Sequence, residues 1–161
     1  NGRFAEAAEG FRRFLDGGGG WVEDNIAACN ALAECFKRSG QSETALSALL
    51  RAFSYDTPRA ETCYAIGVLF LERREYRLAA YWFELCLSLK RPDQVWGFQI
   101  PDCRGFFPCL ELAVCYDRLG ASRKAAEWNE RAARYRPASP SVLQNREYFR
   151  AKIAMEEGSR A

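Results

Sequence analysis

The sequence predicts an all-α fold, a solenoid in which pairs of antiparallel helices stack side by side. The first observation is a register of 34 residues, at which Ala45 and Leu49 return as Ala79 and Phe83. The second is the size of the recurring residues, because alanine-sized positions let two helices approach closely while large neighbours fill the space between units. The third is composition: 48% hydrophobic and 27% charged residues exclude wholesale disorder in a chain of 161 residues.

The same register divides the whole chain. We expect helices over residues 3–15, 22–38, 42–55, 59–73, 76–89, 106–119, 122–135 and 141–156. We expect the units to be a half repeat (1–16), three full repeats (22–58, 59–91 and 105–138), an insertion (92–104) and a capping helix (139–157). A capping helix closes the end of a solenoid, where its polar faces meet water.

The opening half repeat follows the pattern of the second helix in a full repeat. Ala7 and Phe11 match Ala45 and Leu49 at an offset of 38 residues. The four residues in excess of the period coincide with the glycine run 17–20, which we interpret as a linker.

Glycine marks the turn between the two helices of a unit, at Gly2, Gly40 and Gly120. This residue reaches the positive φ that commonly ends a helix at little cost. Arg74 replaces the glycine in the second full repeat, so we expect that turn to differ slightly.

The second and third full repeats are separated by a step of 46 residues, which places an insertion of about 12 residues at 92–104. Two prolines and a glycine forbid a continuous helix there. The insertion is either an ordered loop folded back on the solenoid or a docking element, with Trp96, Phe98 and Asp102 as candidate contact residues. We also expect Asn129, which stands next to Trp128 where the repeat favours an aromatic residue, to hydrogen-bond the backbone of this loop.

Phe4, Phe11 and Phe14 should lie on the opening half repeat. The chain begins at Asn1 without methionine, and we interpret it as a piece of a longer protein. If the phenylalanine face is uncovered, a homodimer is expected to form there.

The residues that carry most catalysis and metal binding are missing or scattered. The sequence holds no histidine, which excludes histidine-dependent triads and histidine-ligated metals. Six of the seven cysteines fall on repeat-equivalent positions, where a free thiol packs as a small apolar side chain, and Cys103 in the insertion is the exception. Without a Cys-x-x-Cys pair we expect no metal site and no disulfide framework, as in a reduced, cytoplasmic protein.

Net charge and hydropathy exclude two classes of partner, nucleic acids and membranes. The net charge is +2 and neither half forms a basic tail, so nucleic-acid binding is not expected. No stretch approaches the roughly 18 unbroken apolar residues of a membrane span, so no membrane partner is expected. Without histidine or a suitably placed carboxylate pair, this segment is not expected to be an enzyme and needs no cofactor.

The pattern resembles the tetratricopeptide repeat, a helix–turn–helix unit of 34 residues whose small positions are matched here by Ala33, Gly67 and Ala113. The resemblance implies an α-solenoid in which the first helix of each pair lines a concave groove for a peptide or partner protein. The groove residues that it implies are Asn30, Glu34, Arg38, Tyr64, Val68, Leu71, Leu110, Val114 and Arg118.

Chaperone-binding repeats grip a C-terminal carboxylate with a lysine and asparagine clamp. Asn30 and Glu34 stand at those positions here, so the clamp is not reproduced and that role is not expected. The implied groove is mixed, with an apolar centre, which suits a protein segment better than a free anion.

Several segments go beyond the generic repeat, including Trp96-Gly97-Phe98, Cys115-Tyr116-Asp117-Arg118 and Gln144-Asn145-Arg146-Glu147. They look like the C-terminal repeat region of bacterial family 2 glycosyltransferases. The resemblance implies a parent enzyme whose catalytic domain, with its nucleotide-sugar and divalent metal, lies outside this segment, which has no Asp-x-Asp motif. The repeats would then bind the acceptor, the parent's own catalytic domain or a second copy. The alternative is a free-standing scaffold or regulatory protein with no attached enzyme.

Overall fold

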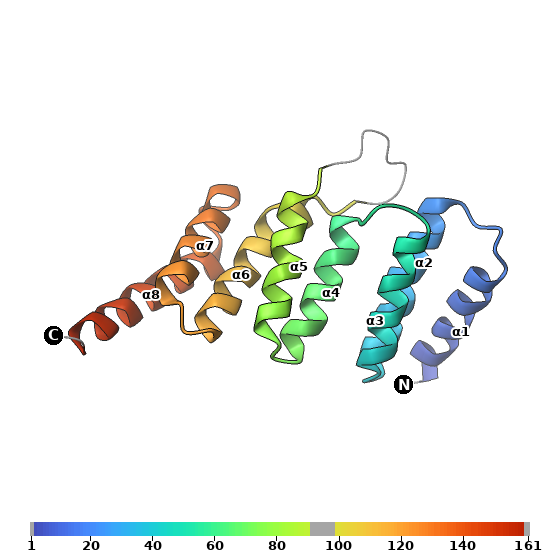
Figure 1. Cartoon of the computed structure of the whole chain (residues 1–161), viewed down its shortest axis with the longest axis horizontal. Helices are drawn as coiled ribbons and strands as arrows, with labels where there is room; N and C mark the ends of the chain where they lie inside the picture. Colours follow the sequence, from blue (N-terminus) through green and yellow to red (C-terminus); the bar gives the residue numbers. More distant parts are fainter. Residues whose placement is uncertain (1, 91–98, 160–161) are drawn as a thin grey trace.

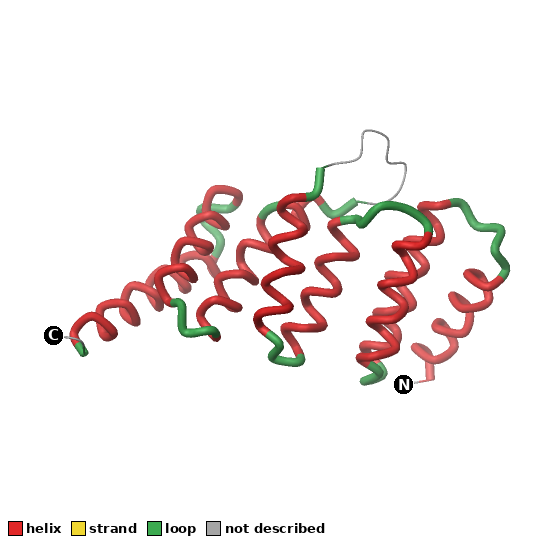
Figure 2. The backbone as a smooth tube through the Cα atoms, viewed as in Figure 1, coloured by secondary structure: helices red, strands yellow, loops and turns green. Residues whose placement is uncertain are grey.

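The computed structural model describes residues 2–90 and 99–159, and Figure 2 shows that all regular structure in these ranges is helical. The α-helices are α1 (Gly2–Asp16), α2 (Val22–Arg38), α3 (Ser42–Arg51), α4 (Ala60–Glu72), α5 (Tyr76–Ser88), α6 (Phe106–Arg118), α7 (Ser122–Tyr135) and α8 (Pro140–Gly158). Two short 3-10 helices are η1 (Ala52–Ser54) and η2 (Pro101–Arg104). The expected all-α fold is confirmed.

The helices pair and stack in a row, as the register predicts. α2 packs against α3, α4 against α5 and α6 against α7, and consecutive pairs contact one another. α1 packs on α2 at one end and α8 packs on α7 at the other. The two ends of the chain therefore lie at opposite ends of an elongated molecule (Figure 1).

Alanine-sized positions bring the helices of each pair together. Ala45, Ala79 and Ala125 are fully buried, at 0% exposure. At Gly67 of α4 the approach is closer still, because an ideal Cβ there would lie 2.6 Å from Cε1 of Phe83 on α5. The Phe83 ring thus occupies the space that a side chain at position 67 would need.

Apolar side chains form two large clusters, one in each half of the solenoid. The first is built from α1 to α4 around Leu15, Phe36 and Leu49, and the second from α5 to α8 around Phe83 and Leu112. Phe70 packs against both clusters, so the core continues along the molecule in the manner of a solenoid. Within the residues that the structure covers, no helix combines the length and apolar character needed to cross a membrane.

All seven cysteines are buried free thiols. Cys63, Cys86 and Cys103 share a small cluster with Ala60 between the two large ones. Burial, reinforced by the charge of Glu61, raises the pKa of Cys63 to about 11 and that of Cys103 to about 12. The prediction that the thiols pack as small apolar side chains is confirmed.

The turn at Arg74 does not differ from its glycine counterparts, so the expectation of an altered turn is wrong. Arg74 has φ 61°, close to the 75° of Gly40 and the 77° of Gly120. Its backbone nitrogen donates to the carbonyl of Leu71 at 2.9 Å, as Gly40 does to Lys37 at 3.0 Å. The packed helix pair imposes the left-handed conformation whatever residue stands in the turn.

Replacing Arg74 with glycine should raise the free energy of unfolding by about 1 kcal/mol, because the left-handed region costs an L-residue about 1–2 kcal/mol and costs glycine nothing. Urea denaturation followed by circular dichroism measures the change. Arg77→Gly, at an exposed helical position three residues later, is the control and should lower stability by about 0.5–1 kcal/mol. A loss of stability in both variants would contradict the strain at position 74.

Part of the insertion, including Trp96 and Phe98, lies outside the described residues. Its last residues fold back on the solenoid. Glu61 of α4 accepts hydrogen bonds from the backbone nitrogen of Ile100 at 3.1 Å and from Arg104 Nη1 at 3.0 Å. Asp102 is half-buried and forms an ion pair with Arg136 at the end of α7.

Asn129 does not hydrogen-bond the insertion as expected. It is completely buried on α7, and its Nδ2 donates to the carbonyl of Val142 at 3.0 Å. Val142 lies in the first turn of α8, so Asn129 contacts the start of the last helix and not the insertion. The amide therefore secures the last helix to the solenoid.

Candidate functional site

The first helices of two neighbouring pairs, α2 and α4, border a groove. Two cavities of about 320 and 380 Å³ open along it and share Asn30, Tyr64 and Ala65 in their walls. The first cavity extends to Lys37 near the end of α2, and the second extends to Phe107 at the start of α6. We call this continuous depression the α2–α4 groove.

The structure brings together part of the expected set. The expected residues that line the α2–α4 groove are Asn30, Glu34, Tyr64 and Val68. Those that lie outside its walls are Arg38, Leu71, Leu110, Val114 and Arg118. Of these, Leu71 and Leu110 pack against the second core cluster, whereas Arg38 and Arg118 are exposed near helix ends.

Further wall residues had no place in the expected set. In the second cavity they are Ala27, Glu61, Ala65, Ile100, Cys103 and Phe107, and the first cavity adds Ala33, Leu49 and Leu69. Helical spacing could have found Glu61 and Ala65, which flank Tyr64 on the same face of α4. The spacing carries no information on Ile100 and Cys103, because their position depends on the path of the insertion.

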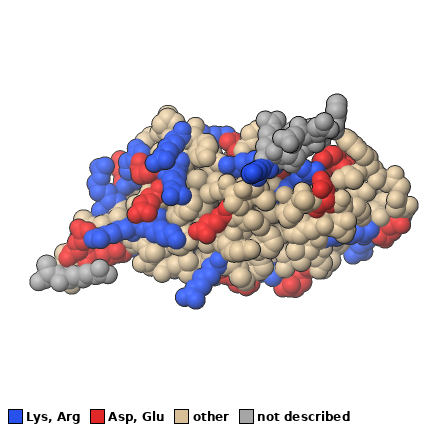
Figure 3. All heavy atoms as spheres, turned by 45° about the horizontal axis from the view of Figure 1, so that its top comes forward, with Lys and Arg blue, Asp and Glu red and all other residues tan. Residues whose placement is uncertain are grey.

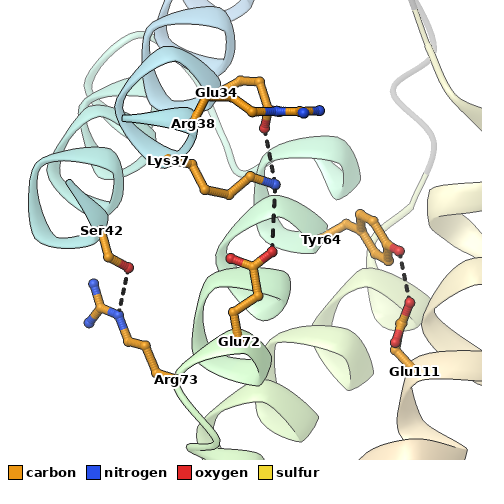
Figure 4. A network of polar contacts seen from close by, with 8 residues as sticks. All are labelled: Glu34, Lys37, Arg38, Ser42, Tyr64, Glu72, Arg73 and Glu111. Atoms are coloured by element: carbon orange, nitrogen blue, oxygen red, sulfur yellow. Dashed lines mark hydrogen bonds and ion pairs between the residues drawn. The ribbon is translucent and has the colours of Figure 1, made fainter. Parts of the chain in front are cut away.

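A charged cluster lies at the end of the groove that Lys37 lines, near the end of α2 (Figure 4). Lys37 Nζ lies 3.1 Å from Glu34 and 3.8 Å from Glu72 of α4, and Arg38 Nε donates to Glu34 at 2.6 Å. Partial burial raises the pKa of Glu34, but hydrogen bonds from Arg38 and Lys37 outweigh it and leave the pKa below its ordinary value. Lys37 is thus already engaged with two acids.

Tyr64 is held on the groove wall from two sides. Its hydroxyl donates to Glu111 Oε1 of α6 at 3.2 Å (Figure 4). Its ring centroid lies 5.5 Å from that of Phe83 and 5.8 Å from that of Phe107. Burial raises the pKa of Glu111, and the hydrogen bond from Tyr64 offsets only part of that rise. Tyr64 therefore links α4 to α6 along this wall.

Replacing Glu111 with glutamine should raise the free energy of unfolding at neutral pH. A carboxyl whose pKa rises on folding costs nothing at a pH below its ordinary pKa. Its destabilising effect grows as the pH rises from the ordinary pKa to the raised pKa and is constant above that. Glutamine keeps an oxygen that accepts the hydrogen bond from the Tyr64 hydroxyl, and it carries no charge. Urea denaturation at about pH 4 and about pH 8 should show a larger gain at the higher pH. An equal gain at both would contradict the role of the charge, and Glu127→Gln, exposed on α7, is the control.

Asn30 carries a hydrogen-bond acceptor that the described part of the chain leaves unused. Its Oδ1 is buried and receives no hydrogen bond from these residues. An unsatisfied buried acceptor costs about 1–3 kcal/mol, so a donor from a bound segment would recover that energy. Asn30 lines both cavities and therefore sits at the middle of the groove.

Charges of both signs are interspersed on the face shown in Figure 3, with lysines and arginines most frequent over the C-terminal half. The acids and bases near the groove follow the same mixture, with Glu34, Lys37 and Glu61 in its walls. A ligand with one strong charge finds no matching field there.

No protein-family model and no curated protein matches this chain. Among solved structures it is similar to a crystal structure of MamA, with 18% identity and a TM-score of 0.74 over 97% of this chain and 82% of that chain. It is also similar to the MamA RS-1 ArsTM double mutant, with 14% identity and a TM-score of 0.74 over 94% and 76%. A third is the NMR structure of the second TPR domain of human RPAP3 with the HSP70 peptide SGPTIEEVD, with 13% identity and a TM-score of 0.64 over 81% and 98%. Together with the paired helices, these likenesses show that the chain has a fold of the tetratricopeptide-repeat type.

Proposed function

We propose that this chain is a protein-interaction module that binds a peptide segment of a partner protein in the α2–α4 groove. The observation that carries the proposal is the buried, unused Oδ1 of Asn30 at the junction of the two cavities. Support comes from the RPAP3 domain of similar fold, whose structure holds a peptide. The groove would hold the segment through one backbone hydrogen bond and apolar contacts.

The walls define the chemistry of the segment. The larger cavity is mainly apolar and lies between Tyr64, Ala65, Ile100 and Phe107, so it accepts an aliphatic or aromatic side chain. A backbone N–H two or three residues away would donate to Asn30. Because Lys37 is engaged with Glu34 and Glu72, the groove favours an internal segment over an acidic C-terminus.

Selection of random peptides on the chain tests the proposal. Peptides that enrich should bind with a micromolar Kd in calorimetry, and Asn30→Ala should weaken them about tenfold through the lost hydrogen bond. Asn145→Ala, at a half-buried asparagine on α8, is the matched control and should leave the Kd unchanged. Amidation of the peptide C-terminus should have no effect. Peptides that bind the Asn30 variant as tightly as the original chain would contradict the site.

A more specific role rests on the sequence motifs alone. We propose that the repeats belong to a family 2 glycosyltransferase and serve acceptor binding, interdomain docking or dimerisation in the cytoplasm. The solved structures reported above lend this no support, and a free-standing scaffold is the alternative. Sequencing the gene that encodes this chain distinguishes the two. A catalytic domain with an Asp-x-Asp motif in the same polypeptide would favour the glycosyltransferase, and a further repeat array would favour the free-standing scaffold.

A further inference from the structure

A second groove, which shares only Ala27 with the α2–α4 groove, is bordered by α1 and α2. These two helices form the N-terminal end of the row (Figure 1). The groove measures about 630 Å³ and is almost entirely apolar. Its walls are Ala7, Gly10, Phe11 and Phe14 of α1 with Asp24, Ala27, Ala28 and Ala31 of α2. Phe4 and Phe14 are 40% and 42% exposed, so large apolar surface faces solvent beside small residues.

The other pairs show what such a face normally carries. Ala45 and Leu49, the counterparts of Ala7 and Phe11, are 0% and 1% exposed because α2 covers them. Ala7 and Phe11 are only half-buried, since the described residues place no helix on that side of α1. The shape of the groove therefore calls for a helix that runs antiparallel to α1, as every first helix runs antiparallel to its second.

We propose that α1 of a second copy fills this groove, so that two chains form a two-fold dimer through antiparallel α1 helices. The apolar stripe is self-complementary in this arrangement. When Phe4 lies opposite Phe14 of the second copy, Ala7 lies opposite its Phe11, so a large side chain meets a small one twice. Within the chain, the Phe83 ring packs against Gly67 in the same large-against-small manner.

The charges beside the stripe agree with this pairing. Glu6 and Arg13 are exposed and lie two turns apart on one flank of α1. In the register that puts Phe4 opposite Phe14, antiparallel packing brings Glu6 to within one residue of the level of Arg13 in the second copy, close enough for the two charges to attract. Asp24 lines the end of the groove near Phe14, where the second α1 begins with Arg3. In this arrangement Glu6, Arg13, Arg3 and Asp24 each lie near a charge of the opposite sign. The dimer does not depend on the α2–α4 groove.

Sedimentation velocity of the chain from micromolar to millimolar concentration tests the dimer. The chain should pass from the mass of one copy to that of two, and Phe4→Glu combined with Phe14→Glu should weaken association by at least about 100-fold, because like charges then face each other. Leu78→Glu, at an exposed apolar position on α5, is the matched control and should dimerise normally. Circular dichroism should show unchanged helix content in both variants.

Charge reversal tests the antiparallel register. Glu6→Arg or Arg13→Glu alone should weaken the dimer about tenfold, and the two together in one chain should restore it, because the opposite signs face each other again. A chain that stays a single copy at every concentration overturns the proposal. A dimer that survives the two glutamates in the stripe, or one that the double reversal fails to restore, also overturns it.

Discussion

Replacing Gly67 with alanine should lower the free energy of unfolding by about 2–3 kcal/mol, which is large for the addition of one methyl group. The new Cβ would lie 2.6, 2.8 and 3.0 Å from three carbons of the Phe83 ring. Phe83, on α5, is fully buried and packs with residues of α4 and α6. The ring therefore has no free space into which it can move. The two helices must separate, or the ring must leave its preferred rotamer.

Urea denaturation gives the change directly, and the chain supplies a control of the same chemistry. Gly10→Ala in α1 adds the same methyl where nothing lies within 4 Å, so it should raise the free energy of unfolding by about 0.5–1 kcal/mol through helix propensity. The comparison should be made at a concentration where the chain is a single copy. Opposite signs at the two positions separate steric contact from propensity.

A second substitution identifies the partner of the clash. Phe83→Leu shortens the side chain that occupies the space beside Gly67. The loss in free energy of unfolding of the double variant should therefore be at least about 1 kcal/mol smaller than the summed losses of the two single variants. Strictly additive losses would show that Gly67 accommodates something other than this ring.

Most of the fold could be predicted from the 34-residue spacing of small and large residues. It placed the alanines of the second helices at the buried positions that they occupy, because burial there depends only on helical spacing and on the neighbouring unit. The conformation of the turn at Arg74 could not be predicted in this way. Residue preference alone favours glycine at positive φ, but the packing of α4 on α5 over-determines the turn and imposes the strain.

The candidate groove was predictable where helices form it and unpredictable elsewhere. Asn30, Glu34, Tyr64 and Val68 follow from the positions of α2 and α4 within their repeats. Contacts made by chain segments without periodicity, such as the link from Glu61 to Ile100, have no signal in the sequence. The partner of Asn129 was missed for a related reason, since it depends on the angle at which α8 leaves α7.

Replacing Arg59 with methionine should lower the free energy of unfolding by about 2–4 kcal/mol. Arg59 is only 8% exposed just before α4, and its Nη2 donates to Glu23 of α2 at 2.9 Å and to Asp56 at 2.6 Å. Methionine preserves much of the length and apolar stem but leaves the nearly buried carboxylate of Glu23 without its cation. The penalty comes mainly from that abandoned charge, because a buried ion pair adds little beyond its own desolvation cost.

Glu23→Gln separates the abandoned charge from lost packing. In the Arg59→Met background, removing the charge of Glu23 should recover at least about 1 kcal/mol in urea denaturation, although the same change alone destabilises the fold. Arg123→Met is the matched control, since its ion pair with Glu157 also joins two helices but is exposed, and it should cost less than about 1 kcal/mol. If the double variant lost as much as the two single variants together, the cost of Arg59→Met would lie in packing. The junction of α2 and α4, and with it the width of the groove, would then depend on the arginine stem and not on its charge.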